Sequence, residues 1–282
     1  MGRLEGKVAI ITGGARGQGR SHALKLASEG ADIVALDVDA DIASLEYALG
    51  TDEQLKETVK GVEELDRRAL GLVADVRSQE QMDGVVAKAL DEFGKVDILV
   101  VNHGIWGLRP FWELSETEWQ DMVDVNLTGV FHAVKAVTPH MIEREDGAIV
   151  ITGSVNAIEP AVDYAHYCAT KAGAEMFSRN VALELGRFGI RCNMVCPSAT
   201  DTDIIKWQGA LDRFVAPGAT VDDLRDGMKH FTGLKGRRLM RPEAMSDAVA
   251  FLVSDDARDI TGITLPVDGG HLIQTGHNHN PG

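Results

Sequence analysis

The sequence has few cysteines, few aromatic residues and no apolar run of about 18 residues, the length that a membrane-spanning helix needs. Only 3 of its 282 residues are cysteines, and Cys168, Cys192 and Cys196 all stand in apolar surroundings. An odd number of such residues favours reduced, buried thiols over a disulfide. The first residues also lack the charged, apolar and small-residue zones of a signal peptide. These absences predict a cytoplasmic protein.

Positive charge is scarce as well. The chain carries 28 Lys and Arg against 43 Asp and Glu, a formal net charge of -15. A protein that binds nucleic acid or an anionic membrane needs a basic face, so we expect neither partner. A composition of 44% hydrophobic and 25% charged residues suits a globular chain with a sizeable core. No linker, repeat or low-complexity stretch divides residues 1–282, so we expect a single domain.

Apolar, β-branched runs alternate with longer amphipathic stretches along the chain. This alternation is typical of a doubly wound α/β protein, in which a parallel sheet carries helices on both faces. The sequence predicts strands at residues 8–12, 32–37, 69–76, 96–102, 147–154 and 190–197, with a last strand within 261–270.

A glycine-rich turn joins the first predicted strand to the first helix. In TGGARGQG, Gly13, Gly17 and Gly19 allow positive φ and close backbone approach, and the helix that begins near Gly19 offers free N–H groups to a pyrophosphate. Glycine-rich turns also close strand–helix units that bind no ligand, so the motif needs support from elsewhere in the chain.

Support comes from Asp37, which ends the second predicted strand eighteen residues after Gly19. A carboxylate there accepts hydrogen bonds from both ribose hydroxyls and repels a 2′-phosphate, so the sequence predicts NAD rather than NADP. Arg16 argues the other way, because a cation in the loop could meet a 2′-phosphate. Asp75 is open to two interpretations: a hydrogen bond to the adenine amino group, or a turn residue at a strand end.

A second group of residues carries chemistry. Tyr167 and Lys171 are four residues apart and share one face of a helix, where an ammonium can lower the pKa of the phenol. Ser154 ends a predicted strand thirteen residues before Tyr167. Together with the glycine loop and Asp37, these residues predict acid–base chemistry beside a dinucleotide.

With these motifs the chain resembles the short-chain dehydrogenase/reductase family, which has a single-domain Rossmann-type fold. The resemblance also includes Asn126 in DVNLTGVF, Pro197 in CPSAT and the closing LPVDGG. It implies Tyr167 as general acid/base, and Lys171 as the partner that lowers the pKa of Tyr167 and holds the nicotinamide ribose. It further implies that Ser154 bonds the substrate oxygen and that Asn126 anchors a water linked to Lys171. The cofactor contacts that it implies include Gln18, Val76, Asn102, Gly104, Pro197 and Thr202.

The sequence departs from the family pattern at two positions. His103 stands in VNHG where members commonly have alanine, and we expect it to fill space or contact the cofactor rather than to catalyse. Ser198 replaces the glycine usual after Pro197.

An additional segment, residues 39–50, follows Asp37 and precedes a helix with a capping box at Thr51 and Gln54 and an apolar stripe at residues 55, 59, 62 and 65. With it the chain resembles the carveol-dehydrogenase-like group associated with mycofactocin. That resemblance implies an insert over the adenine end of a tightly held NAD, and mycofactocin as an external redox partner.

Residues 198–242 are expected to form a substrate lid. Trp207, Phe214, Met228 and Phe231 would give it an apolar pocket, which favours a secondary, cyclic, terpenoid-like alcohol or its ketone. Trp106 and Trp112 fit either the core or the substrate pocket.

The tail, residues 271–282, holds His271, His277 and His279 without other ligands at metal spacing, so we expect no metal. We expect a loose or interface-packed tail. The helix bearing Tyr167 has apolar positions on more than one side, and family members pair such helices, so we expect a homotetramer with twofold axes.

Three other functions fit the sequence less well. A serine hydrolase would need glycines where Thr152 and Asn156 flank Ser154, and a sugar-nucleotide epimerase would need a longer substrate domain. A non-catalytic NAD-binding regulator would keep the glycine loop but has no need of the tyrosine, lysine, serine and asparagine together. The sequence predicts an NAD-dependent alcohol dehydrogenase or ketone reductase, with the regulator as the alternative.

Overall fold

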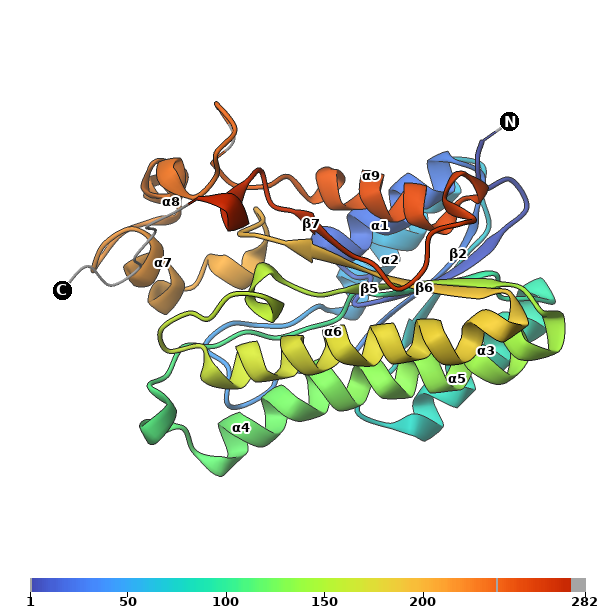
Figure 1. The fold of residues 1–282 in the computed structure, drawn as a ribbon, viewed down its shortest axis with the longest axis horizontal. Coiled ribbons are helices and arrows are strands. Elements are labelled where there is room, and N and C mark those ends of the chain that lie inside the picture. The colour runs from blue at the N-terminus through green and yellow to red at the C-terminus, as the bar shows by residue number, and fades with distance from the viewer. Residues whose placement is uncertain (1, 237, 275–282) are drawn as a thin grey trace.

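A seven-stranded parallel sheet forms the centre of the protein in a computed structural model that describes residues 2–236 and 238–274 (Figure 1). The strand order is β3-β2-β1-β4-β5-β6-β7. Strands β2 and β3 are added on one side of β1 and strands β4 to β7 on the other, so the order switches between β1 and β4. Ligands of such sheets bind beyond the carboxyl ends of the strands at this switch point. The strands are β1 (Val8–Thr12), β2 (Asp32–Asp37), β3 (Ala69–Val73), β4 (Ile98–Val101), β5 (Gly147–Thr152), β6 (Ile190–Pro197) and β7 (Thr264–Val267).

Helices cover both faces of the sheet because its central strands are apolar on both sides and buried. One face carries α1 (Gly17–Ser28), α2 (Asp52–Glu63) and α9 (Pro242–Val253). The other carries α3 (Gln79–Phe93), α4 (Glu116–Val123), α5 (Gly129–Arg144) and α6 (Ala165–Leu185). The doubly wound, single-domain fold expected from the sequence is therefore confirmed.

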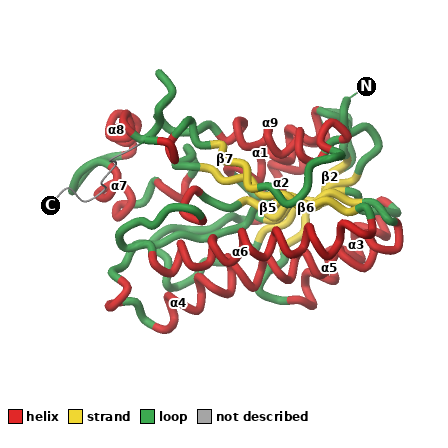
Figure 2. The backbone as a smooth tube through the Cα atoms, viewed as in Figure 1, coloured by secondary structure: helices red, strands yellow, loops and turns green. Residues whose placement is uncertain are grey.

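Short helices and loops gather beyond one end of the sheet, as Figure 2 shows. Between β6 and α9 lie α7 (Gln208–Phe214) and α8 (Val221–Gly227), within the expected lid. Residues 39–50, which precede α2, contain no helix or strand. The capping box that starts α2 at Thr51 and Gln54 is present.

Several boundaries differ from those expected. The fourth strand is Ile98–Val101 rather than 96–102, and the fifth ends at Thr152 rather than at residue 154. The third strand ends at Val73 rather than at residue 76, because the chain turns there into the loop that carries Asp75. The apolar stripe of α2 is buried at Leu55 and Val62, but Leu65 lies past the helix end and is exposed. Among the described residues, no helix combines the length and the apolar character needed to span a bilayer.

Candidate active site

The glycine loop between β1 and α1 has the geometry of a dinucleotide-binding turn. Gly13 and Gly17 have φ of 65° and 54°, values that other residues rarely adopt. A Cβ on Gly19 would lie 1.9 Å from the carbonyl oxygen of Gly13, so no other residue fits there. Helix α1 begins at Gly17, two residues before the expected start, and its first N–H groups face the loop.

Asp37 lies at the carboxyl end of β2 beside this loop. One carboxylate oxygen accepts a hydrogen bond from the Ala15 N–H at 3.0 Å, and the other accepts one from the Val38 N–H at 2.9 Å. Burial raises the pKa of Asp37. A Cβ on Gly50 would lie 2.8 Å from this carboxylate, so the end of the insert packs directly against Asp37.

Arg16 bridges two segments that are far apart in the sequence. Its guanidinium lies 3.3 Å from a carboxylate oxygen of Asp203 and donates a hydrogen bond to the carbonyl of Ala48 in the insert. These contacts occupy the cation that could otherwise meet a 2′-phosphate. Asp75 pairs with Arg77 at 2.7 Å and accepts the Arg77 N–H, the geometry of a turn residue.

A cleft of about 940 Å³ runs along this edge of the sheet. Most of the expected cofactor contacts line it: Gly13, Arg16, Gly17, Gln18, Asp37, Asp75, Val76, Asn102, Gly104 and Thr202. Gly19 is not on the wall and acts through the shape of the loop. The Oε1 atom of Gln18 is buried without a hydrogen-bond partner among the described residues. An orphaned polar atom on the wall of a glycine-lined cleft fits a bound dinucleotide.

A second pocket, of about 920 Å³, continues from this cleft. The two spaces have six wall residues in common: Gln18, Asn102, Gly104, Ile105, Thr202 and Ile204. Ser154, Tyr167, Lys171 and Pro197 line only the second pocket. A ligand in the cleft can therefore reach the space that these side chains border.

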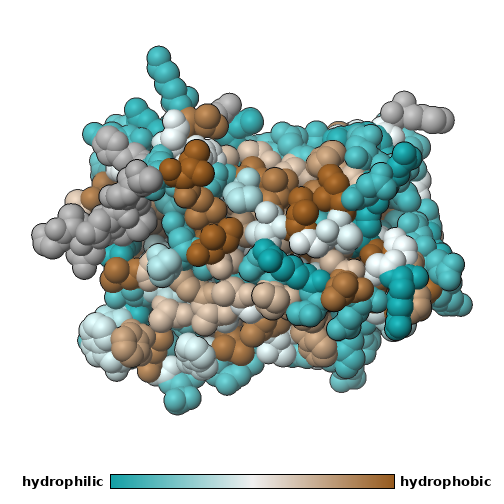
Figure 3. Space-filling model, in the orientation of Figure 1, coloured by the Kyte–Doolittle hydropathy of each residue, from teal (hydrophilic) through white to brown (hydrophobic). Residues whose placement is uncertain are grey.

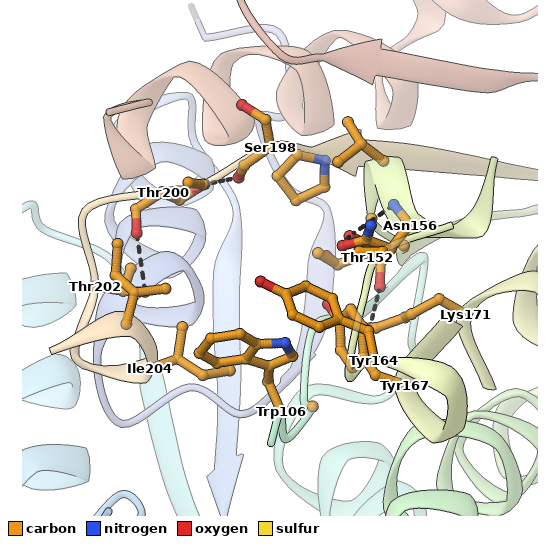
Figure 4. Close-up of a pocket in the computed structure, with 18 of the residues that line it drawn as sticks. Trp106, Thr152, Asn156, Tyr164, Tyr167, Lys171, Ser198, Thr200, Thr202 and Ile204 are labelled. Atoms are coloured by element: carbon orange, nitrogen blue, oxygen red, sulfur yellow. Dashed lines mark hydrogen bonds between the residues drawn. The ribbon is translucent and has the colours of Figure 1, made fainter. Parts of the chain in front are cut away.

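Tyr167 and Lys171 project from the same face of α6 into the second pocket (Figure 4). The Lys171 ammonium donates to the carbonyl of Thr152 at 3.1 Å and lies 5.7 Å from the centre of the Tyr167 ring. Burial raises the pKa of Tyr167 to about 12, against a hydrogen bond with Ser154 that lowers it. Burial also lowers the pKa of Lys171 to about 8.

Burial therefore outweighs the groups that lower the pKa of Tyr167 in this structure, and the expected lowering by Lys171 stays a prediction. The free-energy cost of removing the phenolate from water is larger than the stabilisation that neighbouring groups provide. The Lys171 ammonium is directed at the Thr152 carbonyl.

Ser154 follows β5 and begins a short 3-10 helix, Val155–Ala157. Its hydroxyl accepts the Asn156 N–H at 3.1 Å, which fixes the side chain at the pocket wall. The strand end and the turn thus hold Ser154 beside Tyr167.

Asn126 lies under the pocket in a π-helical turn, Asp124–Thr128. Its amide accepts from the Ile105 N–H and donates to the Ile105 carbonyl, both at 2.8 Å. A Cβ on Gly104 would lie 3.3 Å from Asn126 Oδ1 and 3.4 Å from Lys171 Nζ. The asparagine therefore holds the loop after β4 close to the lysine, and its bond to a water remains a prediction.

Comparison with known proteins agrees with this geometry. A model of the short chain dehydrogenase family matches residues 7–210. The chain belongs to the short-chain dehydrogenase family. It is 40% identical to (-)-trans-carveol dehydrogenase of Rhodococcus erythropolis, over 97% of this chain and 100% of that protein.

Two crystal structures of short-chain dehydrogenases are similar throughout. Carveol dehydrogenase from Mycobacterium avium in complex with NAD is 39% identical with a TM-score of 0.93, over 97% of this chain and 100% of that chain. A short chain dehydrogenase from Mycobacterium paratuberculosis bound to NAD is 33% identical with a TM-score of 0.87, over 97% and 100% of the two chains.

In this short-chain dehydrogenase, His103 is part of the packing under the cleft. Its Nδ1 lies 2.7 Å from the Thr12 hydroxyl, which also accepts the Asn102 N–H. Burial lowers the pKa of His103 to about 3, so the ring is neutral. The ring also lines the cleft, so it fills space and is in reach of a ligand there.

An aromatic cluster supports the outer part of the second pocket. Trp106 is at its centre, 5.3 to 5.6 Å between ring centroids from Tyr164, Trp207 and Phe214. Trp207 and Met228, which we expected at the pocket wall, instead pack behind it and are buried, because the wall positions belong to Trp106, Phe214 and Phe231. Trp112 is 72% exposed, so it belongs to neither the core nor the pocket.

Several side chains at the pocket carry no sequence signature. Tyr47 in the insert accepts the Trp106 N–H at 2.8 Å, and Arg213 and Glu159 line the second pocket. His271, from the expected tail, is buried and bonds Glu159. His277 and His279 lie outside the described residues. Within the described ranges, no three His, Cys, Asp or Glu residues are placed to hold a metal ion.

Proposed function

We propose that this protein is an NAD-dependent alcohol dehydrogenase or ketone reductase. The observation that carries the proposal is the junction of the two spaces: a glycine-lined cleft opens into a pocket bordered by Ser154, Tyr167 and Lys171. A bound nicotinamide would accept a hydride from a secondary alcohol or deliver one to a ketone.

Tyr167 is the group that moves the proton. In the oxidation direction its phenolate takes the proton of the substrate hydroxyl, and in reduction the phenol donates it back. Ser154 holds the substrate oxygen beside the phenol. Lys171 would stabilise the phenolate through its positive charge and hold the ribose of a bound cofactor, while Asn126 would anchor the water through which the lysine exchanges protons with solvent.

NAD is the cofactor that the cleft favours. Asp37 at the end of β2 would accept hydrogen bonds from both ribose hydroxyls and repel a 2′-phosphate. Arg16 is engaged by Asp203 and Ala48 and so gives little help to NADP. The NAD complexes of the two similar dehydrogenases support the same choice.

A cyclic, mainly apolar secondary alcohol suits the second pocket. Trp106, Ile204 and Phe214 supply flat apolar walls, and the similarity to carveol dehydrogenases supports a terpenoid-like substrate. Of the expected lid, the segment from Ser198 to Ile205, helix α7 and Phe231 border this pocket.

The position of the insert supports the proposal that bound NAD exchanges slowly with NAD in solution. Ile42, Tyr47, Leu49 and Gly50 line the cleft together with Asp203 from the lid side, so the insert and the lid would enclose the adenosine end of a bound NAD. A cofactor held in this way needs an external oxidant or reductant, and mycofactocin is the partner that the resemblance suggests.

Assembly as a homotetramer is supported by the outer side of α6. Met176 and Leu183 on this helix are 55% and 82% exposed, and Phe131 on the adjacent α5 is 43% exposed. Figure 3 shows apolar residues spread over this face. Exposed apolar residues that gather on neighbouring helices form a surface that a second copy can bury.

The test begins with the purified protein. The nucleotide released on denaturation is identified, and cyclic secondary alcohols are screened for reduction of NAD and of an artificial electron acceptor. We expect NAD and alcohol-dependent reduction. A protein that binds NAD and oxidises no alcohol, and reduces no ketone with NADH, would be the non-catalytic regulator instead.

A further inference from the structure

One wall of the second pocket carries a cation that has no acidic partner among the described residues. Arg213, on α7, lines the pocket and donates a long hydrogen bond of 3.4 Å to the carbonyl of Val162. It also bonds the hydroxyl of Tyr164, which is buried. Among residues 2–236 and 238–274, no carboxylate lies within 4.0 Å of its guanidinium.

The acidic side chain on the same wall is already compensated. Glu159 lies 2.5 Å from Nε2 of His271, whose Nδ1 lies 2.8 Å from the carbonyl oxygen of Phe231. Because both ring nitrogens face acceptors, this geometry favours the doubly protonated, positive ring. Burial disfavours this charge, but Glu159 and the Phe231 carbonyl outweigh it and raise the pKa of His271.

The charges of the pocket therefore sum to an excess of positive charge. Lys171 is committed to the reacting end by its bond to Thr152, and Glu159 is balanced by His271. Arg213 remains, in a pocket that also has apolar walls such as Trp106 and Phe214. A half-buried guanidinium in apolar surroundings is a strong site for an anion.

We propose that Arg213, together with the Tyr164 hydroxyl, binds a carboxylate of the substrate at a distance from the reacting carbon. The substrate class is then an alicyclic hydroxy acid, or the corresponding keto acid, with an apolar ring between its two polar ends. The proposal rests on the proposed function and narrows it. One guanidinium and one hydroxyl match the single charge of a carboxylate better than the double charge of a phosphate. The carboxylate takes no part in the bond changes.

Binding tests the site without requiring turnover. Calorimetry on the NAD-loaded protein compares cyclohexanecarboxylate with its neutral methyl ester. We expect the acid to bind the wild type more tightly than the ester, and Arg213→Gln to weaken the acid about tenfold or more while leaving the ester unchanged. Arg213→Lys should recover part of the loss.

Arg225→Gln is the matched control, because Arg225 is an exposed arginine of α8 that does not line the pocket. It removes the same charge from the same segment and should leave both affinities at the wild-type values. Equal loss in Arg213→Gln and Arg225→Gln would mean a general charge effect and would overturn the proposal, as would equal binding of acid and ester by the wild type.

Turnover then separates this proposal from the proposed function. With 3- and 4-hydroxycyclohexanecarboxylate, Arg213→Gln should raise KM about tenfold with a smaller change in kcat, because the contact is made equally in ground and transition states. The matching methyl esters should be unaffected. If neutral alcohols react and the acids are not preferred, the dehydrogenase assignment stands and the carboxylate site is wrong. If the acid binds through Arg213 and nothing reacts, the site stands and the proposed function fails.

Discussion

The cofactor cleft and the substrate pocket adjoin each other but are built in different ways. The cleft is formed by strand ends and by a loop in which close backbone contacts require glycine. A Cβ on Gly19, for example, would lie only 1.9 Å from the carbonyl oxygen of Gly13. The pocket depends on α7, α8 and rings that pack on Trp106. Backbone geometry tolerates few sequences, whereas packed side chains can be exchanged for others of similar volume. The difference explains why the sequence points to a cofactor more sharply than to a substrate.

The largest effect on activity should come from a change at Tyr167, where the substrate pocket meets the cofactor cleft. Tyr167→Phe keeps the ring and removes the hydroxyl that moves the proton, so kcat should fall by about 10² or more. Nucleotide binding and the melting temperature should stay near the wild-type values, since the ring still packs. Steady-state kinetics with near wild-type turnover would rule out Tyr167 as the general acid/base.

Removing a ring of the aromatic cluster should affect the lid and spare the cleft. Trp207→Ala leaves a large void behind the pocket wall and should cost about 3 kcal/mol or more of stability, measured by denaturant unfolding. Trp112→Ala is the control and should change stability by less than about 0.5 kcal/mol, because that ring is exposed. Nucleotide affinity should change much less than KM for the alcohol. The reverse pattern would contradict the separation of the two regions.

The preference for NAD over NADP tests the cofactor cleft, the region that depends on backbone geometry. Asp37→Asn keeps acceptor capacity for the Ala15 N–H but removes the negative charge, so the preference for NAD over NADP should narrow by about tenfold. Asp37→Ala should narrow it similarly and also lower stability, because that N–H loses its partner. Comparable use of both cofactors by the wild type would show that Asp37 does not set the choice.

The smallest effect is expected at the insert. Ser44→Ala removes a 2.6 Å bond to Asp121, and Tyr47→Phe removes the bond to the Trp106 N–H. Each loss is worth about 1 kcal/mol. The double variant should therefore release nucleotide several-fold faster in stopped-flow experiments, with kcat for prebound cofactor little changed. An unchanged release rate would mean that the insert does not hold the cofactor.

The sequence predicts local features of this fold well and long-range contacts poorly. Alternating apolar runs located the strands, and the spacing of Tyr167 and Lys171 placed both side chains in one pocket. The Glu159–His271 pair joins residues 112 positions apart, and Arg16 meets Asp203 across 187 positions. No local pattern encodes such pairs, since they exist only after the sheet has assembled. The burial that raises the pKa of Tyr167 is likewise a property of the whole fold.

The contact between His271 and Glu159 also has a consequence for synthesis of the protein. Ribosomes deliver the chain from its amino end, and the glycine loop, Tyr167 and Lys171 all emerge long before His271. The pocket wall formed by Glu159 and Phe231 therefore lacks the support of His271 until that residue has been added to the chain. None of the residues that line the nucleotide cleft lies beyond Ile204, so a nascent chain can supply the whole wall of this cleft while its substrate pocket is still incomplete.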